Sequence, residues 1–160
     1  MSVITYKYKH INGHSELRLL KLEPGDVLIA LQGSLVAVSL ASYPPFEAIS
    51  YAWEDTIRSH SVETPEGRIL INASLHQALI RLRQKQDYRF LWADAIYINQ
   101  DDPCERADQV NIIRSIYRAA QKVLIYLGEE NPLTILSLVL LDKIRYFSSI
   151  TGINKHGIIK

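Results

Sequence analysis

The chain has 160 residues, of which 48% are apolar and 22% are charged, as in an ordinary globular protein. This length suits one domain and leaves little room for a second. Its 18 basic and 17 acidic side chains give a formal charge of +1, which argues against an extended nucleic-acid surface and against an acidic tail. We therefore expect no nucleic-acid partner.

Cysteine content and apolar runs exclude further classes. The single cysteine, Cys104, permits no intrachain disulfide and no thiolate zinc finger, and the scattered histidines predict no metal site. The longest apolar run, residues 133–141, is shorter than the roughly 20 residues that span a bilayer. The N-terminus lacks the apolar stretch of a secretory signal. These features are typical of a cytoplasmic protein without a membrane span.

The first half of the chain is predicted to consist of strands separated by turns. Alternating or continuous apolar patterns bounded by Gly and Pro predict these strands. Their ranges are 16–22, 26–32, 34–40, 46–53, 61–64 and 68–71. Within the range 46–53, Tyr51 and Trp53 share one face and Ser50 lies on the other.

The second half alternates between helices and strands. Helices are predicted from the N-cap Asn72 to about residue 84, from the N-cap Asp102 onward, and over 132–147. Strands are predicted over 88–93 and 122–127, with a loop or short turn over 94–101. Pro103 at the first position and Glu105 at the third predict a capping box for the second helix. This order predicts an α/β fold with a mostly parallel sheet flanked by helices and extra N-terminal strands.

Polar side chains follow two strands of this predicted sheet. Ser50, Tyr51 and Trp53 end one strand, and Asp94 follows another. Ligands of open α/β sheets bind beyond the carboxyl ends of strands. If the two strands are neighbours, these residues meet the later polar residues of the chain around one crevice. Those later residues are Asn99, Gln100 and Glu105.

Each candidate also has a purely structural interpretation. Asp94 is a common type of turn residue, and Glu105 fits a capping box. Trp53 and Trp92 are large enough to be packing residues. Arg106 is equally explained as a solvated charge on a helix. The residues alone leave both interpretations open.

Four ordered segments, 46–56, 74–83, 90–102 and 105–130, together resemble the heterokaryon incompatibility (HET) domain of filamentous fungi. The family pattern contains a SYxWG strand end, an LWxDxxCINQ block and an ERxxQVxxMxxIYxxAxxVxxWLG block. The resemblance covers about residues 16–130 and indicates a single domain over 1–150 with a tail over 151–160.

This chain departs from the family pattern at four positions. Tyr97 replaces Cys, Ile113 replaces Met and Tyr126 replaces Trp. Glu54 replaces a Gly, and a side chain there opposes both a positive φ and the close approach of a ligand. The Glu54 departure is therefore the one that bears on activity.

The resemblance implies a role in programmed cell death when genetically different fungal cells fuse. HET domains have been viewed as distant relatives of TIR domains, which have a flavodoxin-like parallel sheet. Some TIR domains cleave NAD+ with a glutamate. The analogy, which is one of fold, implies a NAD+ glycohydrolase that needs no cofactor.

Under this analogy a carboxylate stabilises an oxocarbenium-like transition state. Glu105 is the first candidate and Asp94 the second. Trp53 or Trp92 would stack on a ring of the ligand, and Arg106 would contact a phosphate. Four further residues would complete the binding site, namely Ser50, Tyr51, Asn99 and Gln100.

The alternative is a non-enzymatic module that signals by self-association or by binding other death-pathway proteins. The absence of a complete catalytic motif and the Glu54 departure favour it. The apolar segment 133–147 could dock on another chain as well as cover the sheet.

Overall fold

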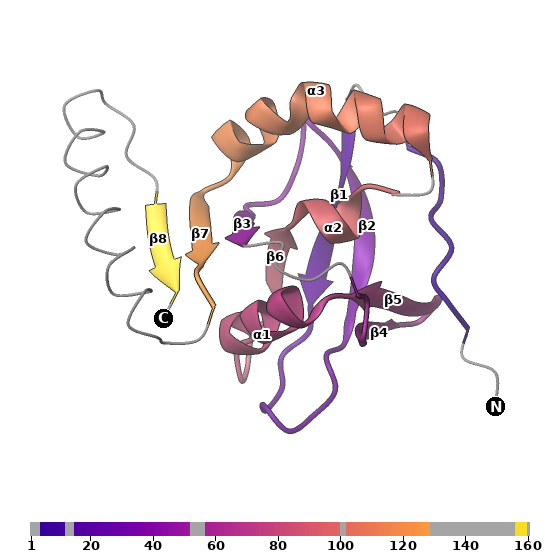
Figure 1. Ribbon diagram of the computed structural model, residues 1–160. Helices are drawn as coiled ribbons and strands as arrows, with labels where there is room; N and C mark the ends of the chain where they lie inside the picture. The colour runs from indigo at the N-terminus through magenta and orange to yellow at the C-terminus, as the bar shows by residue number, and fades with distance from the viewer. Residues whose placement is uncertain (1–3, 12–14, 52–56, 100–101, 129–155, 160) are drawn as a thin grey trace.

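A computed structural model describes residues 4–11, 15–51, 57–99, 102–128 and 156–159. Within these ranges, a central six-stranded sheet and a separate two-stranded hairpin are combined with three helices (Figure 1). In spatial order the sheet strands are β2 (Gly33–Ser39), β1 (Glu16–Leu22), β6 (Arg89–Trp92), β3 (Glu47–Tyr51), β7 (Lys122–Tyr126) and β8 (His156–Ile159). The hairpin and helices are β4 (His60–Thr64), β5 (Gly67–Ile71), α1 (Ala73–Leu82), α2 (Asp94–Tyr97) and α3 (Pro103–Ala119).

The strand directions make this an α/β fold with a mixed sheet. β6, β3, β7 and β8 run parallel to one another, whereas β1 is antiparallel to both β2 and β6. The α/β prediction with added N-terminal strands is confirmed in that form. The sheet as a whole is mixed, however, and is not clearly the parallel sheet of a flavodoxin-like fold. β8 was not predicted, because the sequence there shows no clear pattern.

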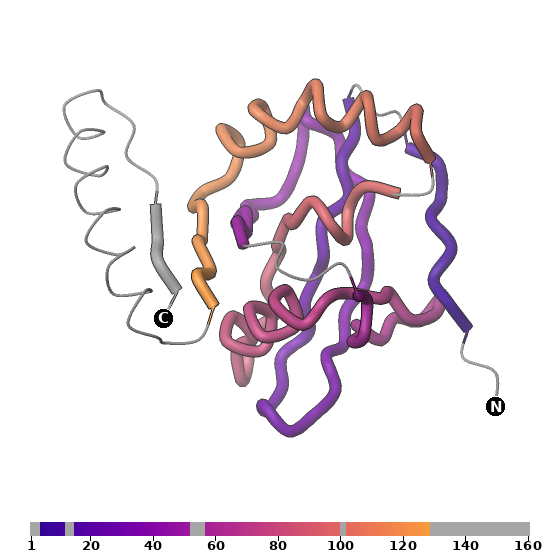
Figure 2. The backbone as a smooth tube through the Cα atoms, viewed as in Figure 1, coloured from indigo at the N-terminus to yellow at the C-terminus, as the bar shows by residue number. Residues whose placement is uncertain are grey.

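Two predicted helix starts are confirmed, with their caps. The Asn72 side chain accepts a hydrogen bond from the Leu75 N–H at 2.9 Å, and α1 then buries its apolar stripe. The Asp102 side chain accepts from Cys104 N–H and Glu105 N–H at the start of α3. α1 contacts β3 and β4, while α2 contacts β1 and β5. In Figure 2 the tube of α3 passes across one end of the sheet.

The strand predicted over 26–32 is wrong. This apolar segment forms a turn, and only Gln32 makes a bridge, to Glu63. The physical reason is Arg83, whose guanidinium donates to backbone carbonyls of the segment and draws them into a compact loop. Those carbonyls are consequently turned toward α1 rather than toward a strand.

The largest buried side chains support the carboxyl end of β6. Trp92 and Tyr97 are fully buried and stack with ring centroids 6.0 Å apart and planes at 16°. Tyr117 of α3 meets the Trp92 ring edge-on at 5.3 Å. This aromatic cluster fixes α2 and α3 relative to β6, and so fixes the residues that follow the strand.

Candidate functional site

The carboxyl ends of β3 and β6 lie side by side, which is the arrangement on which the predicted crevice depends. The strands are parallel neighbours, with Ala48 paired with Trp92. Tyr51 ends β3 and Asp94 begins α2 directly after β6. Burial raises the pKa of the Tyr51 hydroxyl, and the negative charge of Asp94 raises it further. The Asp94 carboxylate and the Tyr51 hydroxyl therefore interact electrostatically at this edge of the sheet.

Tyr117 of α3 belongs to the same group of residues. Burial raises the pKa of Tyr117, and the Asp94 charge again adds to the effect. Asp94 itself is half-buried, and its Oδ1 accepts a hydrogen bond from the Ala95 N–H at 2.8 Å. Asp94 therefore binds the backbone at the start of α2, as a turn residue does, and also lies beside two tyrosines. A half-buried carboxylate flanked by neutral phenols is suited to stabilise a developing positive charge.

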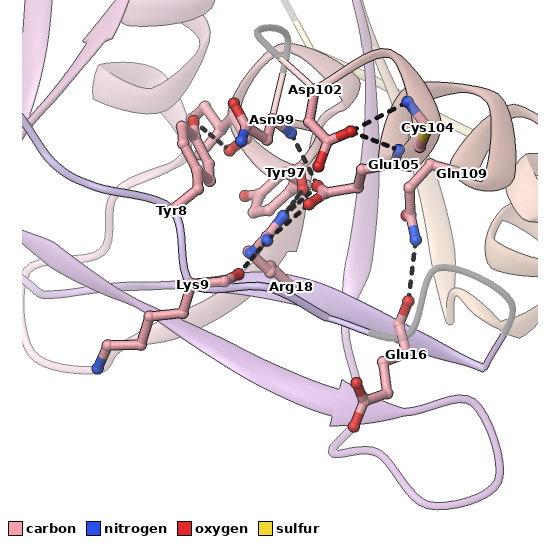
Figure 3. Close-up of polar contacts among 11 residues, drawn as sticks. Tyr8, Lys9, Glu16, Arg18, Tyr97, Asn99, Asp102, Cys104, Glu105 and Gln109 are labelled. Atoms are coloured by element: carbon pink, nitrogen blue, oxygen red, sulfur yellow. Dashed lines mark hydrogen bonds and ion pairs between the residues drawn. The ribbon is translucent and has the colours of Figure 1, made fainter.

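Glu105 is held in a buried ion pair with Arg18 of β1 (Figure 3). The guanidinium donates to both carboxylate oxygens, at 2.5 Å to Oε1 and 3.0 Å to Oε2. The two side chains are only 3% and 2% exposed. Oε1 also accepts a hydrogen bond from the Asn99 N–H at 2.9 Å. The carboxylate of Glu105 is thus fully engaged with protein groups.

The predicted capping box is confirmed only for Asp102. The Asp102 N–H donates to the Asn99 carbonyl at 3.1 Å, and the Glu105 carboxylate turns toward Arg18 and Asn99 instead. Arg18 completes the arrangement by donating to the carbonyls of Tyr97 and Lys9. The Arg18–Glu105 pair therefore joins β1, α3, the segment after α2 and the N-terminal segment.

Sequence reasoning missed Arg18. The available signal was a charged residue within the apolar strand ELRLLKL, where both neighbours of Arg18, Leu17 and Leu19, are fully buried. A strand that is buried on both faces offers its arginine no solvent, so a buried carboxylate partner is required. The sequence names no such partner, which lies 87 residues away.

The other predicted site residues are placed in different ways. Trp92 is fully buried, in agreement with the packing interpretation. Arg106 is exposed in the first turn of α3, and Asn99 and Ser50 are half-buried. Trp53 and Gln100 lie outside the described residues, as do Glu54 and the predicted helix over 132–147.

The described part of the chain was also searched for metal sites and for membrane-spanning helices. Within the described ranges, no group of three or more His, Cys, Asp or Glu side chains is arranged to hold a metal ion. No helix in the same ranges has the length and apolarity needed to cross a membrane. The candidate site at the carboxyl ends of β3 and β6 is a polar group of side chains formed by Asp94, Tyr51 and Tyr117.

The fold and this site define an α/β domain with polar residues at the carboxyl ends of parallel strands. The family described as "Heterokaryon incompatibility protein (HET)" matches residues 46–150. The chain is 34% identical over 128 residues to "Heterokaryon incompatibility protein 6, OR allele" of Neurospora crassa. That alignment covers 71% of this chain and 19% of the relative, so the chain spans about a fifth of the relative's length. No solved structure matches. The chain belongs to the heterokaryon incompatibility family.

Proposed function

We propose that this chain acts in fungal heterokaryon incompatibility and triggers programmed cell death by hydrolysing NAD+. Family membership supports the biological role. The observation that carries the chemical part is the Asp94 carboxylate, which lies beside Tyr51 where two parallel strands end. This is the edge at which α/β sheets bind ligands.

The proposed reaction cleaves the bond between nicotinamide and ribose. Nicotinamide leaves as a neutral base with the bonding electron pair, and C1′ of the ribose develops oxocarbenium character. Water then adds its oxygen to C1′ and gives up a proton, so the products are nicotinamide, ADP-ribose and one proton. The protein contributes a negative charge close to C1′, and Asp94 supplies it.

The two predicted carboxylates take different parts in this proposal. Asp94 is half-buried and adjoins two phenols, so it is the catalytic residue. Glu105 is a positioning residue, because Arg18 and the Asn99 N–H occupy its oxygens. The sequence-based order, with Glu105 before Asp94, is reversed in this proposal. Arg106 at the exposed start of α3 remains the proposed phosphate contact.

The test is nicotinamide release from NAD+ by purified protein and by Asp94→Asn. Asparagine keeps an oxygen for the Ala95 N–H and removes the charge. We expect release to fall by about 10²–10³-fold, the usual effect of losing one transition-state contact. Asp87→Asn makes the same chemical change at an exposed loop position and should leave release unchanged.

Two results would contradict the proposal. Wild-type protein that releases no nicotinamide, even when concentrated, removes the NAD+ reaction altogether. Activity of Asp94→Asn within a few-fold of wild type removes Asp94 from catalysis. Inducible expression in a fungal host links the chemistry to biology, because cell death and loss of NAD+ should appear together and should both disappear with Asp94→Asn.

A second candidate function is signalling by self-association, and one observation favours it. Three consecutive apolar side chains, Val27, Leu28 and Ile29, are exposed on one loop. Exposed apolar groups gathered in one place are typical of contact surfaces. Self-association and NAD+ hydrolysis are compatible, since the loop and Asp94 lie on different parts of the chain.

A further inference from the structure

A hollow of about 460 Å³ lies where β3, β6 and β7 begin, and residues from all three strand starts line it. Asp94 follows the opposite end of β6, so the hollow is separate from the candidate site described above. Its volume falls within the range of roughly 300–1,000 Å³ that is usual for small-molecule sites. The hollow is therefore large enough to hold a ligand of its own.

Two aromatic side chains, Tyr88 and Phe90, form a corner in this hollow. Their ring centroids lie 5.5 Å apart, and their planes meet at 77°. Tyr88 is 52% exposed, whereas Phe90 is half-buried. The Lys21 ammonium covers one face of the Tyr88 ring, 4.4 Å from its centroid, so a ligand would stack on the other face. An exposed ring that is braced by a second ring is suited to stack on a planar group.

Two side-chain amides, on Gln84 and Gln121, line the same hollow. Both residues are exposed, and within the described part of the chain neither side chain is bonded to another residue. An amide group presents a donor and an acceptor together, which is the combination that binds the N6 and N7 edge of adenine. The amides can thus bind the edge of a base while the aromatic corner binds its face.

The charged groups of the hollow leave one positive charge without a counter-charge. Arg89 donates to the Glu47 carboxylate and, through Nη1, to the Leu82 carbonyl at 2.8 Å, so the charges of Arg89 and Glu47 offset each other. Lys122 is exposed and takes part in no ion pair among the described residues. Its ammonium, a mobile point charge, is suited to bind a phosphate group.

We propose that this hollow binds an adenine nucleotide, with the base stacked on Tyr88 and the phosphate at Lys122. β3 lies between β6 and β7, so the starts of these two outer strands are about 10 Å apart, which is two strand spacings. The base, sugar and phosphate of one nucleotide can bridge such a span when the lysine side chain reaches toward it. The proposal is independent of NAD+ hydrolysis at Asp94, because the two places lie at opposite ends of β6.

A simple anion such as free phosphate is the less suitable occupant of the hollow. It would use the Lys122 charge alone and would leave the aromatic corner and the two amides without a ligand group. One exposed ammonium in water binds a lone anion only weakly. The lining therefore favours a ligand that combines a planar ring with a phosphate.

The experiment is isothermal titration calorimetry of the full chain with AMP, adenosine and ribose 5-phosphate. AMP should bind most tightly, because adenosine lacks the phosphate and ribose 5-phosphate lacks the base. Tyr88→Ala should weaken AMP binding about tenfold, which is typical for the loss of one stacking ring. Tyr88→Phe keeps the ring and should bind AMP as wild type does.

The phosphate contact is tested with Lys122→Gln. This variant should weaken AMP binding by about three- to fivefold and leave adenosine binding unchanged, because only AMP carries the charge. Lys7→Gln is the matched control, since Lys7 is exposed and does not line the hollow. Lys7→Gln should bind AMP as wild type does, and circular dichroism verifies that each variant is folded.

The outcomes that would overturn the proposal are distinct. Folded wild-type protein that binds no AMP refutes the site, and folded Tyr88→Ala that binds AMP as wild type does refutes the stacking. Ribose 5-phosphate that binds as tightly as AMP would reduce the site to an anion contact. Asp94→Asn should bind AMP normally, and loss of binding in this variant would place the nucleotide at Asp94 instead. None of these results depends on whether the protein hydrolyses NAD+.

Discussion

Replacing Glu105 by Gln should strongly destabilise this chain. Glutamine keeps the size of the side chain and an oxygen for the Asn99 N–H, but it removes the counter-charge of Arg18. The Arg18 side chain is 3% exposed, so its guanidinium cannot be rehydrated without opening the fold. The substitution thus isolates the effect of one buried, uncompensated charge.

The expected cost follows from the geometry of the pair. Removing one partner of a buried ion pair typically costs about 3–5 kcal/mol. Arg18 keeps two carbonyl acceptors, on Tyr97 and Lys9, so we expect the lower end, about 3 kcal/mol. This is a large part of the roughly 5–15 kcal/mol that stabilises a domain. At about 2–4 °C per kcal/mol, the melting temperature should fall by about 6–12 °C.

Denaturant unfolding followed by circular dichroism measures this cost, with two controls. Glu63→Gln breaks the exposed ion pair with Arg68, whose side chains are 36% and 44% exposed, and should cost less than about 1 kcal/mol. Adding Arg18→Met to Glu105→Gln removes both charges and should recover most of the loss. A cost below about 1 kcal/mol for Glu105→Gln would refute the buried pair, as would a double variant less stable than the single one.

Two pH dependences follow from perturbed side chains. Burial lowers the pKa of His76, and the adjacent His60 ring and Arg83 lower it further. On acidification, His76 therefore becomes protonated in the unfolded chain near pH 6.5, before it does so in the folded chain. The contribution of His76 to stability should be complete above that pH and should be lost on acidification. In unfolding titrations, the stability of His76→Gln should fall less steeply with pH than that of wild type, and equal slopes would contradict this reasoning. Burial raises the pKa of Tyr8 to about 12 against the opposing charge of Arg18, and the Tyr8 hydroxyl donates to the Ile96 carbonyl at 2.8 Å. Since an unfolded tyrosine ionises near pH 10, stability should be lost as the pH rises from about 10 toward 12, and Tyr8→Phe should lose less; an unchanged alkaline transition would count against this reasoning.

Local patterns in the sequence predicted most strands and the first two helix starts. The caps at Asn72 and Asp102 are short-range chemistry, because each side chain binds an N–H within three residues. The strand predicted over 26–32 failed because its backbone partners are on Arg83, more than 50 residues away. Apolar content alone does not distinguish a buried strand from a loop tied down by a distant guanidinium.

The candidate site was predictable where it depended on topology. Neighbouring parallel strands must place Tyr51 and Asp94 at one edge, and the structure does so. The role of Glu105 was not predictable in the same way. Its partner Arg18 comes from an antiparallel N-terminal strand, and no pattern within the helix indicates that contact.

The family pattern itself acquires a physical interpretation from these contacts. Its third block begins with Glu105 and continues to Gln109, and both are buried on the side of α3 that faces β1. Glu105 binds Arg18, and the Gln109 side-chain amide donates to the Glu16 carbonyl at 3.0 Å. These two residues thus join α3 to β1, which gives both positions a structural role in the fold. A catalytic role for Glu105 would require its carboxylate to leave the Arg18 pair, so Glu105→Gln and Asp94→Asn test the two carboxylates in different ways, the first through stability and the second through nicotinamide release.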